Sequence, residues 1–186
     1  MGFVELLFVA FGASMDAFAV ALCQGLSLRN ISYKQSLLIS IFFGFFQAFM
    51  PLLGYLLASS FSDYIQAFDH YIAFGLLSFL GIRMIYESKD GCELTDSLSI
   101  KRLFLLAIAT SIDALAIGIT FAFLNVKIIE SVLVIGLVTF VLSFIATKIG
   151  KFIGDKMHQI SQIVGGSILI LIGLKILLEH LGVINF

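Results

Sequence analysis

Apolar residues dominate six stretches of the sequence, and short polar segments separate them. A helix that crosses a membrane needs about 20 mostly apolar residues. The six stretches are, in chain order, residues 4–24, 36–59, 67–86, 103–124, 131–150 and 161–180. Arg83 and Lys175 interrupt the third and sixth near one end, where long basic side chains reach the interface. The pattern predicts an all-α, polytopic membrane protein with six transmembrane helices.

The composition supports this prediction. Hydrophobic residues make up 60% of the 186 residues and charged residues 12%, which is about half the charged share of a soluble domain. The net charge of −1 leaves no basic face for nucleic acid, so the expected partner is the lipid bilayer. The run 17–19 resembles a signal-peptide cleavage site, but no Lys or Arg precedes it and Asp16 interrupts the apolar run. We therefore expect the first stretch to be retained as a helix.

Basic residues indicate how the chain is oriented. Those on one side of the predicted bundle are Arg29, Lys34, Arg83, Lys89, Lys101, Arg102, Lys148, Lys151 and Lys156, whereas only Lys127 and Lys175 lie on the other. Cytoplasmic segments carry the excess of Lys and Arg. The polar linker 89–102 is therefore expected in the cytoplasm, with both termini outside.

The linker divides the sequence into two similar halves, 1–88 and 103–186. ASMDAFAVAL near the N-terminus aligns with TSIDALAIGI after the linker, and FLGIRMIYE aligns with LIGLKILLE. Between these motifs Gln47 aligns with Ser143, and Gly54 aligns with Gly150. Three matches in the same order indicate an internal duplication.

Each half holds three predicted helices, so equivalent helices cross the membrane in opposite directions. The sequence thus predicts one integral membrane domain made of two inverted three-helix repeats. Transporters use this architecture, and they bind substrate near the middle of the membrane, where the repeats meet.

Asp16 and Asp113 are equivalent residues of the two halves, each near the middle of an uncharged stretch. A central aspartate costs roughly 2.5–3.5 kcal/mol on insertion scales. The residues at helical spacing around them are mostly small, which permits close helix approach: Gly12, Ala13, Ala19 and Cys23 around Asp16, and Ala109, Thr110, Ala116 and Thr120 around Asp113. Two neighbouring carboxylates repel unless a proton or a cation lies between them. No Lys or Arg is available at that depth, so a bound cation is predicted.

Other polar residues are candidates for the same site. Pro51 should kink the second helix and free the backbone carbonyl of Gln47. With Ser143 and Thr110, the site would be rich in neutral oxygens, which suit Mg²⁺, Ca²⁺ or Mn²⁺. The alternatives are that Gln47 and Ser143 only join helices, that Pro51 is only a packing kink and that the aspartates are structural.

Two further serines, Ser14 and Ser111, precede the aspartates by two residues, on the wrong face of a regular helix. They are expected to bond back to their own helix, and they become ligands only where that helix is locally unwound.

The stretches SMDAFA, FFGFFQAFMPLLGY, FLGIRMIYE and TSIDALAIG resemble the MntP family of bacterial manganese exporters, in the LysE superfamily. The resemblance covers nearly the whole chain. It implies a protein of the bacterial cytoplasmic (inner) membrane that exports Mn²⁺ as its substrate, without a permanent cofactor. It also implies that Asp16 and Asp113 are essential, while some relatives carry Glu at the position of Gln47.

The leading hypothesis is thus a secondary exporter that binds Mn²⁺ between Asp16 and Asp113. The ATP-binding pattern GxxxxGK[ST] is absent, so a gradient must drive transport, and proton antiport is expected because carboxylates hold either metal or proton. An amino-acid exporter of the LysE type is a second hypothesis. A third is an intramembrane aspartyl protease, an enzyme whose GxGD motif is missing here. The sequence leaves the oligomeric state open.

Overall fold

The computed structural model describes residues 2–28, 31–59, 69–89, 98–124 and 126–181, and within these ranges the chain is helical, with no β-strand. The helices are α1 (Phe3–Ser27), α2 (Tyr33–Ser59), α3 (Asp69–Glu87), α4 (Ile100–Ala109), α5 (Ile112–Phe123) and α6 (Ile128–His180). The predicted all-α class is confirmed.

Among the described residues, five segments are long and apolar enough to cross a membrane. They are Phe3–Ser27, Tyr33–Ser59, Ile100–Phe123, Ile128–Gly150 and His158–Glu179. The third predicted stretch is found as α3, whose apolar part, Ala73–Tyr86, is shorter. Exposed phenylalanines such as Phe45, Phe49 and Phe79 cover the outside of the bundle. An apolar outer surface on apolar helices is that of a polytopic membrane protein.

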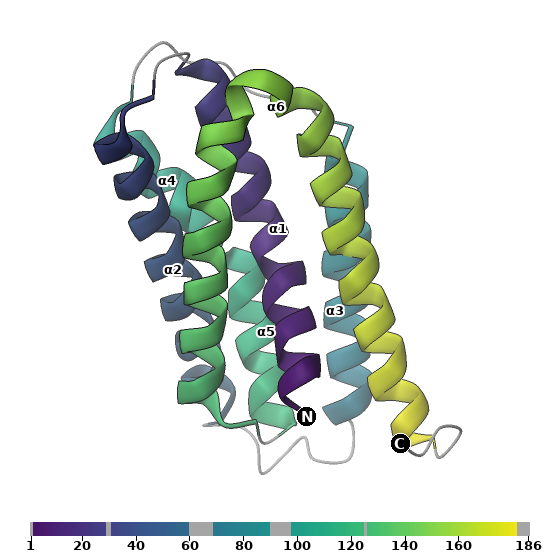
Figure 1. The fold of residues 1–186 in the computed structure, drawn as a ribbon. Helices are drawn as coiled ribbons and strands as arrows, with labels where there is room; N and C mark the ends of the chain where they lie inside the picture. Colours follow the sequence, from purple (N-terminus) through teal and green to yellow (C-terminus); the bar gives the residue numbers. More distant parts are fainter. Residues whose placement is uncertain (1, 29–30, 60–68, 90–97, 125, 182–186) are drawn as a thin grey trace.

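The fifth and sixth predicted spans are two arms of one helix, α6, which turns over at one end of the bundle (Figure 1). At 1.5 Å per residue, its 53 residues would reach about 80 Å if straight, far beyond a hydrocarbon core of about 30 Å. The connection between the two arms covers residues 151–157, between the spans Ile128–Gly150 and His158–Glu179. It contains no proline, so its backbone can stay helical through the turn.

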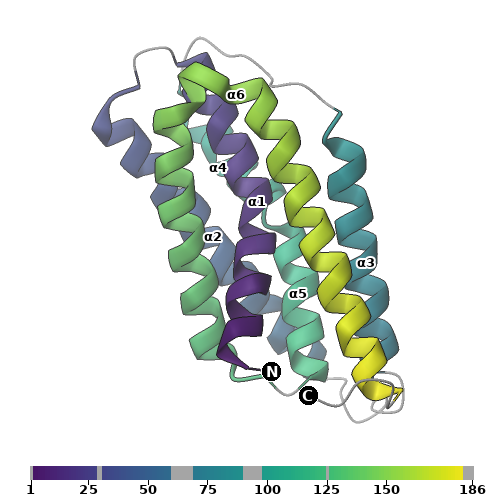
Figure 2. The same cartoon turned by 45° about the vertical axis from the view of Figure 1, so that its right-hand side comes forward.

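Helix α1 rises between the two arms of α6, as both views show (Figures 1 and 2). Small residues allow this approach: Gly25 lies against the backbone of Thr147 on the first arm, and Gly12 against the side chain of Leu169 on the second. α1 begins, and α6 ends, at the same end of the bundle (Figure 1). The first residues of α1 and the last residues of α6 therefore lie at one end of the bundle, which is consistent with an even number of crossings.

Candidate cation site

Asp16 lies in the enclosed middle of α1 and is 7% exposed. Its Oδ1 accepts a hydrogen bond of 2.6 Å from Nε2 of Gln162, on the second arm of α6. The predicted stripe of small residues around it faces protein, since Gly12, Ala13, Ala19 and Cys23 are all buried. The first carboxylate is therefore held inside the bundle, between α1 and α6.

Asp113 lies just after an interruption that the hydropathy pattern did not predict. The expected helix over 103–124 is divided into α4 and α5 by a turn at Thr110 and Ser111. The hydroxyl of Ser111 bonds the Ala107 carbonyl at 2.6 Å, and the hydroxyl of Thr110 bonds the Leu106 carbonyl at 3.0 Å. Such bonds can bend a helix slightly, but Ser14 makes the same bond within the continuous helix α1, so they do not by themselves explain the interruption.

The interruption changes the surroundings of Asp113. This buried residue stands in the first turn of α5, where backbone N–H groups lack intrahelical partners and the helix dipole favours a negative charge. It also alters the predicted small stripe, because Ala109 is exposed on the far side of the turn while Thr110 and Thr120 are buried.

Gln47 joins the two segments that carry the aspartates. Its side chain is 1% exposed, and its Nε2 donates to the Ala13 carbonyl of α1 at 2.8 Å. Its Oε1 accepts a bond of 3.2 Å from Ser111, between α4 and α5. Ala13 is one turn from Asp16, and Ser111 is two residues from Asp113, so one amide holds both acidic segments at the same depth. Pro51, one turn beyond Gln47, is buried within α2.

The remaining predicted residues divide into two groups. Ser14 bonds back to the Ala10 carbonyl at 2.5 Å, as expected, and also bonds Thr139 of α6 at 2.8 Å. Ser143, one turn beyond Thr139, is buried, and its Oγ has no hydrogen-bond partner among the described residues. The structure thus brings Gln47 and Ser111 into direct contact and leaves Ser143 apart from that bond.

Sequence reasoning missed Gln162 and Thr139, both of which contact α1. Gln162 stands near the start of the sixth apolar stretch, which was interpreted only as a membrane span. The available signal was an amide side chain within a span that is mainly apolar. Its partnership with Asp16 crosses 146 positions of sequence and needs the turn of α6, which no local pattern contains.

The buried polar side chains around the two aspartates offer mainly oxygen atoms. Two carboxylates lie in the bundle with amide and hydroxyl oxygens, and the described residues contain no group of three or more His, Cys, Asp or Glu side chains arranged to hold a metal. Oxygen ligands of mixed charge suit Mg²⁺, Ca²⁺ and Mn²⁺, whereas Zn²⁺ and Cu(I) sites use nitrogen and sulfur.

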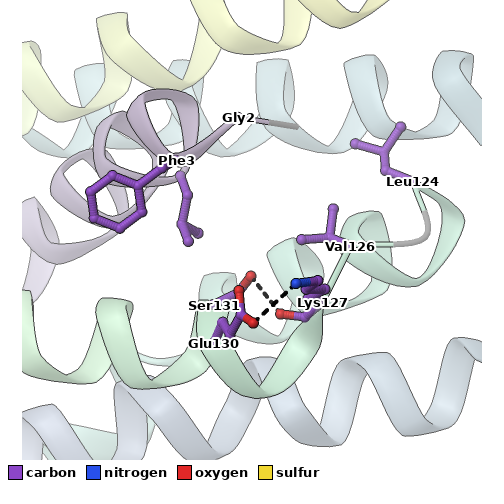
Figure 3. Close-up of a pocket in the computed structure, with 8 residues that line it drawn as sticks. Gly2, Phe3, Leu124, Val126, Lys127, Glu130 and Ser131 are labelled. Carbon is purple, nitrogen blue, oxygen red and sulfur yellow. Dashed lines mark hydrogen bonds and ion pairs between the residues drawn. The ribbon is translucent and has the colours of Figure 1, made fainter.

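A pocket of about 260 Å³ lies elsewhere, between the start of α1 and the connection from α5 to α6 (Figure 3). Phe3 and Leu124 line it, and Lys127 forms an ion pair of 3.2 Å with Glu130 at its rim. Thirteen residues of helix, or about 20 Å, separate Phe3 from Asp16. This pocket is therefore not the carboxylate site.

Apolar spanning helices around two buried carboxylates define a polytopic membrane protein with a polar interior site. A family model described as "Putative manganese efflux pump" matches residues 30–177. The chain therefore belongs to the MntP family of manganese efflux pumps, as its motifs predicted, and this is a family of transporters rather than of enzymes.

Curated relatives match over nearly their full length. One from Acetivibrio thermocellus, "Putative manganese efflux pump MntP", is 58% identical over 100% of this chain and 96% of its own. A relative of the same name from Desulfitobacterium hafniense is 55% identical over 98% of this chain and 97% of its own. No solved structure matches.

Proposed function

We propose that this chain is a secondary active exporter that carries Mn²⁺ out of the cytoplasm. The observation that carries the proposal is the full-length similarity to relatives named as manganese efflux pumps. The interior supplies a fitting site, because Asp16 and Asp113 are buried in segments that Gln47 joins. Both termini face the outside, since most Lys and Arg residues gather at the opposite end.

In this proposal Asp16 and Asp113 bind the cation, and neutral oxygens complete its shell. The hydroxyl of Thr110 donates its proton to its own helix, so its lone pairs remain available to a cation. Gln47 Oε1 accepts one bond from Ser111 and keeps a second lone pair, and the Ser111 hydroxyl, as the donor, keeps its own lone pairs. Ser14 and Ser143 are neutral candidates on α1 and α6.

We also propose that the two halves are inverted repeats, which the packing of α3 against the second arm of α6 supports. Gly81 of α3 lies against the backbone of Gly166, and Gly173 lies against Phe74. The alignment of the motifs makes Gly81 equivalent to Gly173 and Phe74 equivalent to Gly166. The two contacts are therefore the same contact seen from each half, as a two-fold axis requires.

The first and second helices of the repeats are matched less closely, and the difference suggests how the cation is moved. Ser111 bonds Gln47 across the halves. The equivalent residues of the other half are Ser14 and Ser143. Ser14 instead bonds Thr139, which lies four residues before Ser143. The glycine contacts differ between the halves in the same way. Between α2 and α5, Gly118 contacts Pro51 and Gly54 contacts Leu115. Between α1 and α6, Gly25 contacts Thr147 and Gly150 contacts Leu22, so each partner on α1 lies four residues beyond the position equivalent to that on α5. Four residues correspond to about 6 Å along a helix.

If α1 and α6 adopted the register now seen between α2 and α5, and the reverse, the site would open to the other side of the membrane. In the exchanged state Ser14 would face Ser143. We expect an added thiol oxidant to form a disulfide between the cysteines of a Ser14→Cys, Ser143→Cys variant during Mn²⁺ transport, with the linked peptides identified by mass spectrometry. Without Mn²⁺ the yield should fall. Equal yields in both conditions would contradict an exchange tied to transport.

Transport itself is tested in everted membrane vesicles, whose cytoplasmic face points outward. We expect Mn²⁺ to accumulate in vesicles that contain the protein, and not in matched vesicles without it. Labelled lysine should not accumulate in either. Lysine uptake without Mn²⁺ uptake would favour the amino-acid exporter, and cleavage of a transmembrane reporter would favour the protease.

We propose proton antiport as the driving reaction. Outward movement of a dication against an inside-negative potential costs about 4.6 kcal/mol per 100 mV, because each charge contributes about 2.3 kcal/mol. Protons that move inward on the same carboxylates offset this cost. Collapse of the pH gradient with the membrane potential clamped should slow Mn²⁺ uptake by everted vesicles severalfold, and an unchanged rate would exclude proton coupling.

A further inference from the structure

Gln162 carries a buried side-chain amide beside Asp16. It lies on the second arm of α6 and is 2% exposed. Its Nε2 donates to Asp16 Oδ1 at 2.6 Å, while its Oε1 is buried and has no hydrogen-bond partner among the described residues. A buried carbonyl oxygen is normally satisfied, so this atom points to a ligand beside Asp16.

A side-chain amide can interact favourably with a cation site both when the site is empty and when it is filled. Its N–H₂ group complements a carboxylate that holds no cation, because a charge-assisted hydrogen bond forms. Rotation of the amide by half a turn exchanges nitrogen for oxygen, and amide oxygens are ordinary ligands of hard dications. A dication on Asp16 would repel the N–H₂ group and attract Oε1.

We propose that Gln162 belongs to the cation site, as a stand-in for the cation when the site is empty and as a neutral oxygen ligand when it is filled. This inference rests on the proposed function and adds a residue to its site. It also connects cation binding to the second arm of α6, because Gln162 is carried by that arm and Asp16 by α1.

Direct Mn²⁺ binding to the purified full-length protein in detergent tests the inference, with free Mn²⁺ followed by electron paramagnetic resonance. We expect Gln162→Leu to raise the Kd at least tenfold. Gln162→Glu keeps an oxygen ligand and should keep the Kd within threefold of wild type, or lower it. Gln24→Leu, at a buried glutamine two turns beyond Asp16 on α1, is the matched control and should leave the Kd unchanged.

The Glu variant separates a ligand from a purely structural bond. An ionised glutamate cannot donate to Asp16 and would repel it, so at a pH where both carboxylates are ionised a structural role predicts that Gln162→Glu binds Mn²⁺ as poorly as Gln162→Leu or worse. That result would overturn the inference, even where Gln162→Leu fails to fold. An unchanged Kd in Gln162→Leu would also overturn it. Absence of Mn²⁺ binding in the wild type would instead contradict the proposed function itself.

Discussion

Replacement of Asp16 or Asp113 by asparagine is expected to abolish manganese export. Asparagine keeps the shape of the side chain and one oxygen but removes the charge. Two unit charges 4 Å apart attract by about 4 kcal/mol at an effective dielectric constant of 20, and more for a dication. Because 1.4 kcal/mol is a factor of ten, we expect kcat/KM for Mn²⁺ in everted vesicles to fall at least about 100-fold in either variant.

Glu130→Gln is the matched control. This carboxylate lies in the first turn of α6, and its side chain is 68% exposed, so the same chemical change should leave transport unchanged. The Tm in detergent of Asp16→Asn and Asp113→Asn shows whether each variant is folded, so that a loss of transport can be separated from a loss of structure. Normal export by either aspartate variant would show that the site is assigned wrongly.

The sequence predicted the parts of this site that depend on a single helix. Asp16 lies in a regular apolar run with small neighbours at helical spacing, so its burial in α1 followed from period and side-chain size. Gln47 was singled out because Pro51 should free its backbone carbonyl beside its side-chain amide, and the side chain does join the two halves. Hydropathy and residue spacing are sufficient to predict which side chains are buried where the helix is continuous.

Features that depend on a local break in a helix or on distant contacts were not predictable in this way. The turn at Thr110 and Ser111 divides a run whose flanking residues are apolar on both sides, so hydropathy cannot reveal the interruption. Local unwinding of the helix was the stated condition for Ser111 to be a ligand, and the turn meets that condition. Gln162 depends on the path of α6, which is fixed only when that helix packs on α1.

The contact between α2 and α5 is expected to make Gly118→Ala one of the most destabilising single substitutions in the chain. A Cβ at Gly118 would overlap the backbone carbonyl of Pro51, and a Cβ at Gly54 would overlap the carbonyl of Leu115. Backbone atoms cannot rotate away, so the two helices must separate. Overpacking of this kind costs typically 1–3 kcal/mol and occasionally more. At about 2–4 °C per kcal/mol for a chain of this size, the Tm in detergent should fall by roughly 2–12 °C.

Gly75→Ala provides the control for the intrinsic preference of helices for alanine. Gly75 lies within α3, and no atom lies within 4 Å of a Cβ built there, so only the gain of up to about 1 kcal/mol in helix propensity remains. The same substitution should therefore raise the Tm slightly at Gly75 and lower it at Gly118 and Gly54. Because α2 carries Gln47 and α5 carries Asp113, separation of these helices should also weaken Mn²⁺ export. Equal Tm values for Gly75→Ala and Gly118→Ala would mean that α2 and α5 are not packed backbone to backbone, and the common depth of the two acidic segments would lose its support.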